Sequence, residues 1–411
     1  MKTEIFTETM DGAAEIIRKG GLVAVPTETV YGLAGNGLNE QAVAEIYRVK
    51  GRPEVKPLSL MVHDAGAMER YCKNVPAAAY ALAEKFWPGP LTIVLESKDV
   101  VPEIVRAGGA TVGLRCPDHP MTLELLKCCG LPLAAPSANP SGAPSPKTAQ
   151  DVLQYFDGAI DGVIDGGACG LGRESTIIDL SRTPYRILRQ GALPEEEITK
   201  VLRQKMTVVG LTGGTGCGKT TAMDAVTALG GLTIDCDEVY HTLGETSESL
   251  REQLIARFGP ACYATGVLNT KPIGEIVFHD PEALLELNAI THAAVREEVN
   301  RRLDEWAMAG GTLAAVDAIA LFESGLSEDC DFAVGITAPF EQRMARIMAR
   351  DGISEEYARA RITSQKPDDY YETNCARVLR NDGTAAEFAA ACKEFFTEVM
   401  EHGNQNRRLP E

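Results

Sequence analysis

The segment at residues 213–220, with the sequence GGTGCGKT, limits the fold of this chain more than any other. It has the form G-x-x-x-x-G-K-[ST]; an apolar run at 207–212 precedes it and a helix-like run at 221–229 follows it. In this context the glycines let backbone N–H groups surround phosphate oxygens, and the helix N-terminus adds a positive dipole. The segment therefore predicts a nucleoside triphosphate site, with a Gly-rich turn that binds no ligand as the alternative.

The polar positions of this loop have distinct predicted roles. Lys219 is expected to contact the β- and γ-phosphates, and the hydroxyl of Thr220 is expected to ligate Mg²⁺. The residues expected to hold the nucleotide are Gly213, Gly214, Gly216, Gly218, Lys219, Thr220 and Thr221.

The length of 411 residues favours two or three domains, each large enough for its own core. A charged, helix-like stretch at 195–204 is followed by Met206, which directly precedes the strand of the phosphate loop. We interpret this methionine as the former start of a separate protein, with an ordinary core methionine as the alternative. The expected domains are residues 1–198 and 206–400.

Composition restricts the location and the partners of the chain. No apolar run approaches the ~20 residues that span a bilayer, and the N-terminus lacks the apolar core of a signal peptide. The 11 cysteines lack disulfide-like spacing, which predicts a reducing cytoplasm. The net charge is −18; residues 1–200 hold 20 basic and 25 acidic side chains, and residues 201–411 hold 20 and 33. Broad nucleic-acid binding is therefore not expected, although a local basic groove in the first half stays open.

Two carboxylates end the short strand expected at 231–237. Residues i and i+2 of a strand face the same side, so Asp235 and Asp237 are expected to point together toward the phosphates. One would position or deprotonate an acceptor hydroxyl and the other would orient Mg²⁺ through water. A solvated turn is the alternative.

Arginines recur on a helix expected after residue 337. Arg343, Arg346 and Arg350 are spaced to share one face, and Arg359 and Arg361 follow. This pattern predicts a lid that closes over the triphosphate and neutralises charge in the transition state. Nearby acidic residues leave a solvated face as the alternative.

Residues 206–400 resemble dephospho-CoA kinase. The matching segments are 211–220, 234–237, 288–292, 317–323, 361–365 and 381–383. The resemblance implies transfer of phosphate from MgATP to the ribose 3′-hydroxyl of dephospho-CoA, with Asp237 as catalytic acid/base beside Lys219, and with Asp235, Asp237 and His292 on the acceptor. The chain departs from the family where proline is usual, at Ile319 and Ala293.

The first half carries polar loops instead of a phosphate loop. A strand at 22–25 leads into hydroxyl groups around Thr29, and Lys50, Arg52 and Lys56 lie within seven residues. Three cations held between prolines suit a polyanion such as triphosphate, with a solvated basic loop as the alternative. Arg115 ends an apolar strand, where a bidentate carboxylate clamp is expected.

These motifs, with the loops at 136–145 and 170–178, resemble the threonylcarbamoyl-AMP synthase (YrdC) family over residues 5–195. The family condenses L-threonine, bicarbonate and ATP, and its product serves the modification of adenosine 37 in tRNA. The resemblance implies that Thr29, Arg115 and Ser175 contact threonine. It also implies that the nucleotide is held by Lys50, Arg52, Lys56, Ser137, Asn139, Ser145 and Arg189. Met61 stands where some members have histidine.

We therefore expect an α/β protein with a YrdC-like twisted, mostly mixed sheet first and a parallel-sheet P-loop kinase with a helical lid second. The expected partners are L-threonine, bicarbonate and dephospho-CoA, with transient contact to tRNA-modification proteins and no membrane. Two alternatives stay open: action of the second half on a different small acceptor, and a non-catalytic RNA-binding role for the first half.

Overall fold

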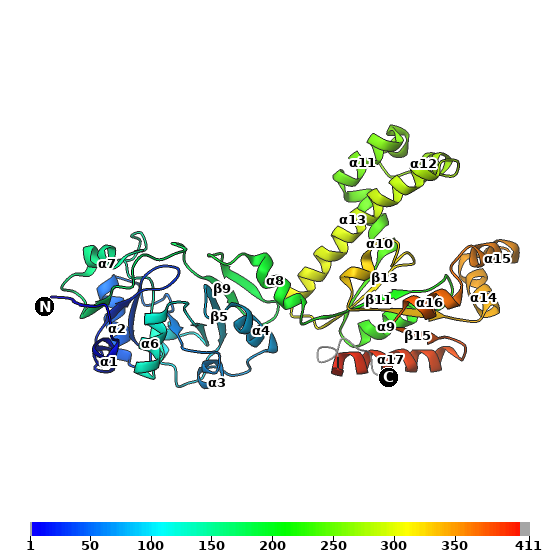
Figure 1. The fold of residues 1–411 in the computed structure, drawn as a ribbon. Coiled ribbons are helices and arrows are strands. Elements are labelled where there is room, and N and C mark those ends of the chain that lie inside the picture. The colour runs from blue at the N-terminus through cyan, green and yellow to red at the C-terminus, as the bar shows by residue number, and fades with distance from the viewer. Residues whose placement is uncertain (1, 403–411) are drawn as a thin grey trace. The chain divides into compact units, whose positions relative to one another are not determined.

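The computed structural model describes residues 2–402, which form two compact units. The first unit extends to Leu202 and includes Met308–Gly310; the second comprises Arg203–Ala307 and the residues from Gly311 onward. Figure 1 shows both units as α/β structures. No helix in the described range is long and apolar enough to cross a membrane.

The first unit is built on a ten-stranded mixed sheet with the order β1-β8-β2-β3-β7-β4-β6-β5-β9-β10. Strand β2 pairs in parallel with β8 and antiparallel with β3, and β5 pairs in parallel with β9 and antiparallel with β6. The mixed sheet predicted for this half is confirmed. The strands are β1 (Glu4–Phe6), β2 (Val23–Val25), β3 (Gly32–Asn36), β4 (Ser59–Met61), β5 (Leu91–Glu96), β6 (Thr111–Arg115), β7 (Leu133–Ala134), β8 (Gly162–Ile164), β9 (Thr176–Asp179) and β10 (Arg186–Arg189).

Short helices connect these strands, and local capping signals delimit several of them. Helix α2 begins after Asn39, whose side chain accepts hydrogen bonds from the N–H groups of Gln41 and Ala42, and it ends at Gly51 in the left-handed region. The helices are α1 (Asp11–Arg18), α2 (Glu40–Lys50), α3 (Ala67–Tyr71), α4 (Ala77–Phe86), α5 (Glu103–Arg106), α6 (Pro120–Cys129), α7 (Ala149–Phe156) and α8 (Glu195–Arg203).

The second unit has an all-parallel sheet with the order β12-β13-β11-β14-β15, as predicted. Its central strand β11 is buried along its whole length, which explains the uninterrupted apolar run before the phosphate loop. The strands are β11 (Thr207–Thr212), β12 (Leu232–Asp235), β13 (Leu313–Asp317), β14 (Phe332–Thr337) and β15 (Arg377–Arg380).

The helices of the second unit pack around more than one core. Helices α9 (Lys219–Ala228) and α17 (Ala385–His402) pack against the sheet and share its core. In Figure 1, α11 and α12 lie beside the far end of the long helix α13, away from the sheet, around a small core of their own. The bounds of these and the other helical elements are α10 (Cys236–Thr246), α11 (Glu248–Phe258), η1 (Pro260–Tyr263), α12 (Thr270–Val277), α13 (Pro281–Met308), η2 (Leu326–Asp329), α14 (Phe340–Asp351), α15 (Glu355–Thr363) and α16 (Asp368–Asn374).

Candidate active sites

The phosphate loop connects β11 to α9 in a conformation that requires glycine. Gly213 has a φ of 149° and Gly216 a φ of 80°. A Cβ atom would lie 2.3 Å from the carbonyl oxygen of Ile336 at Gly213, and 2.9 Å from that of Arg343 at Gly216. The two glycines therefore meet both a backbone and a packing requirement. Helix α9 begins at Lys219, so its first N–H groups face the loop.

Lys219 lies between the loop and a carboxylate that is 15% exposed, that of Asp317. Its Nζ donates to the carbonyl of Gly213 at 3.3 Å and lies 3.7 Å from Oδ1 of Asp317. Asp317 ends β13, directly beside Leu211 of β11, because parallel strands place their carboxyl ends at the same edge of the sheet. The segment 317–323 was part of the sequence match, but Asp317 was not selected as a site residue. Its position at the end of an apolar, strand-like run was the feature of the sequence that could have identified Asp317 as a site residue.

Burial raises the pKa of Asp317 to about 6; Lys219 opposes this shift, and Asp235 and Asp237 add to it. The ordinary carboxyl value is 3.8, so the folded protein favours the protonated form of Asp317 more than the unfolded chain does. Stability from this group is complete below pH 3.8 and is lost as the pH rises to about 6.

We predict that Asp317→Asn removes this pH dependence. Between pH 4 and pH 7 the free energy of unfolding of the second unit should fall by about 2 kcal/mol more in the original protein than in the variant. Urea unfolding of the nucleotide-free protein at several pH values checks this. Parallel pH profiles for the two proteins would contradict it.

Asp235 and Asp237 do not lie together on a strand, contrary to the reasoning from their spacing. Asp235 ends β12 and caps α10: its Oδ1 accepts from the N–H of Asp237 at 2.8 Å and of Glu238 at 3.2 Å. Asp237 lies in the first turn of that helix. Aspartate favours the N-cap position because its side chain satisfies free N–H groups there. The helix thus begins one residue after Asp235.

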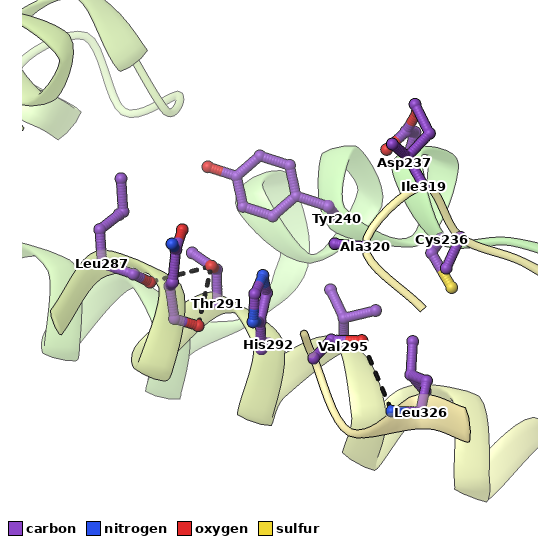
Figure 2. A pocket seen from close by; sticks show the side chains of 13 residues that line it. Cys236, Asp237, Tyr240, Leu287, Thr291, His292, Val295, Ile319, Ala320 and Leu326 are labelled. Carbon is purple, nitrogen blue, oxygen red and sulfur yellow. Dashed lines mark hydrogen bonds between the residues drawn. The ribbon is translucent and has the colours of Figure 1, made fainter. Parts of the chain in front are cut away.

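A cavity of about 310 Å³ opens beside Asp237 (Figure 2). Asp237 and Tyr240 reach it from α10, Thr291 and His292 reach it from α13, and Ile319 borders it after β13. Burial lowers the pKa of His292, while the charge of Glu323 opposes that shift. Of the predicted acceptor residues, Asp237 and His292 line this cavity and Asp235 does not. Ile319 is 43% exposed; Ala293 is not among the lining residues.

Arg343 supports the phosphate loop from α14. This buried guanidinium donates through Nε to the carbonyl of Thr215 at 3.0 Å and through Nη2 to Oε1 of Gln365 at 2.7 Å. Gln365 also accepts from the N–H of Thr215 at 2.9 Å and donates to its hydroxyl at 2.7 Å. Residues more than 120 positions apart therefore fix one turn of the loop.

The other arginines of the expected lid divide into two kinds. Arg346 donates to the carbonyl of Gly216 at 3.3 Å and to Oδ1 of Asn381 at 3.1 Å. Three others form ion pairs with acidic neighbours instead: Arg350 and Arg361 with Asp351, and Arg359 with Glu355. The prediction that these arginines act from one functional face is therefore wrong for Arg350, because an ion pair with Asp351 holds its guanidinium at the surface.

The first unit contains a second cavity, of about 150 Å³. The sequence-predicted residues that line it are Arg52, Arg115, Ser137, Ser175 and Arg189, and Met61 lines it as well. The remaining predicted residues, Thr29, Lys50, Lys56, Asn139 and Ser145, are not among its lining residues. Thr29 and Ser145 nevertheless bond directly to side chains that do line it.

Arg115 already binds a carboxylate of its own chain. Its Nη2 donates to Oε1 of Glu28 at 2.8 Å and to the hydroxyl of Thr29 at 2.8 Å, and its side chain is 9% exposed. Glu28 also accepts from the N–H of Asp118 at 3.0 Å. Sequence reasoning selected Thr29 and Arg115 but missed Glu28, which precedes Thr29 and accepts from the same arginine nitrogen.

Lys50 is buried rather than presented to the cavity. Its Nζ donates to the main-chain carbonyls of Ser137 and Asn139, and burial lowers its pKa to about 8. Lys50 thereby holds the loop that contains Ser137 against α2. Lys56 is exposed, and only Arg52 of the three predicted cations lines the cavity. The three cations therefore do not converge on one point, because the end of α2 turns Lys50 into the interior.

Arg189 and Ser175 are joined at the edge of the same cavity. Arg189 donates to the carbonyl of Ser175 at 3.0 and 2.8 Å and to its hydroxyl at 3.1 Å. The Ser175 hydroxyl also lies 2.8 Å from that of Thr92 on β5. Antiparallel pairing of β9 with β10 places these residues together.

Comparison with known proteins matches each unit separately. A family model described as telomere recombination, that of the Sua5/YciO/YrdC proteins, matches residues 15–191. A model described as dephospho-CoA kinase matches residues 207–387. The threonylcarbamoyl-AMP synthase of Pyrococcus abyssi is 49% identical over 190 residues, which are 46% of this chain and 56% of that protein. The chain thus spans little more than half the length of that relative.

Two further relatives are covered more completely. The threonylcarbamoyl-AMP synthase of Mus musculus is 37% identical over 209 residues, covering 49% of this chain and 72% of that protein. The dephospho-CoA kinase of Syntrophotalea carbinolica is 34% identical over 180 residues, covering 44% and 85%. Both resemblances seen in the sequence are confirmed, and the chain belongs to the threonylcarbamoyl-AMP synthase family through its first unit and to the dephospho-CoA kinase family through its second.

Proposed function

We propose that the protein is a bifunctional enzyme with one active site in each unit. The first unit forms threonylcarbamoyl-AMP from L-threonine, bicarbonate and ATP, and the second phosphorylates the 3′-hydroxyl of dephospho-CoA with ATP. The observation that carries the proposal is that each unit has its own cavity, lined by residues of the motifs that define its family.

In the second unit, the phosphate loop holds the triphosphate of ATP and Lys219 moves from Asp317 to the β- and γ-phosphates. The Thr220 hydroxyl and the carboxylates at the sheet edge fit Mg²⁺, which takes oxygen ligands and retains water. Mg²⁺ would supply charge neutralisation between the phosphates. Asp237 faces the cavity beside this loop, so it accepts the proton of the acceptor hydroxyl there.

In the first unit, the reaction needs positioning and charge neutralisation more than a strong base. The amine of threonine attacks CO₂ or bicarbonate, and the carbamate oxygen attacks the α-phosphate of ATP with release of pyrophosphate. Arg115, Thr29 and Ser175 hold threonine, while Arg52, Ser137, Ser145 and Arg189 hold the nucleotide. Lys50 and Asn139 act by fixing the loop of Ser137. The product would pass to the proteins that modify tRNA.

The location proposed for these activities is a reducing cytoplasm. All 11 cysteines are free thiols, and most of them are buried by the cores of the two units. Such thiols persist where disulfide formation is not favoured.

Chromatography of nucleotide products on the intact protein tests both activities. MgATP with dephospho-CoA should give ADP and CoA, and MgATP with threonine and bicarbonate should give pyrophosphate and threonylcarbamoyl-AMP. No turnover in the first mixture, with turnover of another acceptor from a panel of nucleosides and small alcohols, would identify a different kinase. No turnover in the second, together with salt-sensitive tRNA binding, would identify an RNA-binding module.

Asp237→Asn should lower the kcat for dephospho-CoA by about 10² to 10⁴-fold with little change in KM, because the amide keeps the shape but cannot accept the proton. Steady-state kinetics of CoA formation check this. Asp224→Asn, an exposed aspartate on α9, is the matched control and should behave as the original protein. An equal loss in both variants, or a change in KM alone, would contradict the assigned role.

A further inference from the structure

A single carboxylate, that of Glu174, lines the cavity of the first unit. The other charged side chains that line it are arginines: Arg52, Arg115 and Arg189. Glu174 immediately precedes Ser175 and β9, and its carbonyl accepts a hydrogen bond from the N–H of Ala192 at 2.8 Å. Its backbone is therefore held at the cavity wall, and the sequence motifs gave this side chain no role.

Glu174 forms no ion pair with these arginines. Its one side-chain partner within the described range is the Ser145 hydroxyl, which donates to Oε1 at 2.8 Å. The donors of the arginines are directed elsewhere: Arg52 to the carbonyls of Lys56 and Pro57, Arg115 to Gly89, Glu28 and Thr29, and Arg189 to Ser175. The Glu174 carboxylate is thus held by a hydroxyl and not by an arginine of the cavity.

The surroundings of Glu174 also favour its charged form. The Ser145 hydrogen bond holds the pKa of Glu174 below its ordinary value against the opposing effect of burial, and the charges of Arg189 and Arg173 act in the same direction. The half-buried carboxylate is therefore available in its charged form to a cationic ligand. The substrates of this site bring two cations, the metal ion of the ATP complex and the ammonium group of threonine.

We propose that Glu174 and the Ser145 hydroxyl ligate the divalent cation that accompanies ATP in the first unit. The inference rests on the synthase function proposed above. Mg²⁺ is bound in nucleotide sites by one or two carboxylates together with substrate phosphates, and a hydroxyl is a common additional ligand. Ser145 belongs to the nucleotide-binding motif, so its bond to Glu174 places the carboxylate on the nucleotide side of the cavity.

This arrangement differs from a site made by the protein alone. Within residues 2–402 no group of three or more His, Cys, Asp or Glu side chains could hold a metal ion. A site of one carboxylate and one hydroxyl becomes complete only when phosphate oxygens supply the remaining ligands. Arg52 and Arg189 neutralise the other phosphate oxygens, so that cationic side chains and metal share the charge of the triphosphate.

The test compares ATP binding with and without metal in the full chain. Lys219→Ala is introduced first, so that the phosphate loop of the second unit does not contribute. Calorimetric titration with ATP is then carried out in EDTA and in excess Mg²⁺, for this parent, for an added Glu174→Gln, and for an added Glu84→Gln, an exposed control on α4. ATP-dependent binding of Mn²⁺, followed by electron paramagnetic resonance, reports the metal directly.

The proposal predicts opposite effects in the two conditions. Glu174→Gln should bind metal-free ATP as tightly as the parent or more tightly, because a negative charge is removed. It should bind ATP with Mg²⁺ at least about tenfold more weakly and lose the Mn²⁺ signal. Glu84→Gln should match the parent throughout, and Glu174→Asp should recover part of the Mn²⁺ signal.

Other outcomes overturn the proposal and are distinguishable. If Glu174→Gln weakened ATP binding equally in EDTA and in excess Mg²⁺, Glu174 would have a structural role. Unchanged ATP and Mn²⁺ binding with a raised KM for threonine would assign Glu174 to the ammonium group instead. No ATP binding by the Lys219→Ala parent in either condition would overturn the proposed function of the first unit and the metal site with it.

Discussion

Lys219→Ala is expected to lower phosphorylation of dephospho-CoA by about 10³-fold or more, since a cation that neutralises the transferring phosphate is removed from a water-poor site. Threonine-dependent pyrophosphate release should stay within about twofold of the original rate, because the two cavities belong to different units. The variant also removes the ion-pair partner of Asp317. The fold should tolerate this, since a carboxylate with a raised pKa can take up a proton. Separate assays of CoA and of pyrophosphate measure both effects.

Lys393→Ala on α17 is the control for this prediction, because Lys393 is an exposed lysine outside the phosphate loop. It should leave both activities unchanged. Loss of both activities in Lys219→Ala would contradict two independent sites, and full kinase activity would contradict nucleotide binding at this loop.

Arg52→Ala is expected to have the reverse effect. It should lower formation of threonylcarbamoyl-AMP by about 10² to 10³-fold through loss of a cation that faces the nucleotide, while CoA formation continues. Stability should change little, because within residues 2–402 the hydrogen bonds of the Arg52 side chain go to the carbonyls of Lys56 and Pro57, in its own loop. Product chromatography and thermal unfolding measure the two quantities.

Arg48→Ala provides a matched control four residues earlier. Arg48 is exposed on α2 and pairs with Glu45 on the same helix, so its removal should change stability little and spare both activities. If Arg48→Ala and Arg52→Ala both lost formation of threonylcarbamoyl-AMP, the loss would be explained by a general effect of charge, and the role assigned to Arg52 would be wrong.

The architecture of both units followed from local patterns that the fold retains. The apolar run at 207–212 became the fully buried strand β11, and the Gly-rich segment after it became the turn into α9. These predictions succeeded because backbone conformation there depends on neighbouring residues: glycines supply positive φ, and continuous apolar residues supply a strand buried on both faces. Both families were recognisable for the same reason, since their motifs are short and contiguous.

Spacing alone was a poor guide where a side chain could satisfy the backbone. Asp235 was expected to face the phosphates with Asp237, but it caps α10 and shares its Oδ1 between two N–H groups. Lys50 was expected beside Arg52 at a polyanion, but it is buried and binds two carbonyls of the loop at 137–139. In both cases the side chain forms hydrogen bonds with backbone N–H or carbonyl groups, although the motif predicted that it would bind a ligand.

The sequence by itself determined the two α/β units, the phosphate loop and the membership of two families, because these depend on residues that are neighbours in the chain. Only the tertiary structure decided which charged groups meet. Glu28 reaches Arg115 across 87 positions and Ser145 reaches Glu174 across 29, while Asp317 meets Lys219 through the pairing of β11 with β13. The pKa and the partner of a side chain depend on burial and on distant charges, which strand order and packing establish and which no local pattern contains.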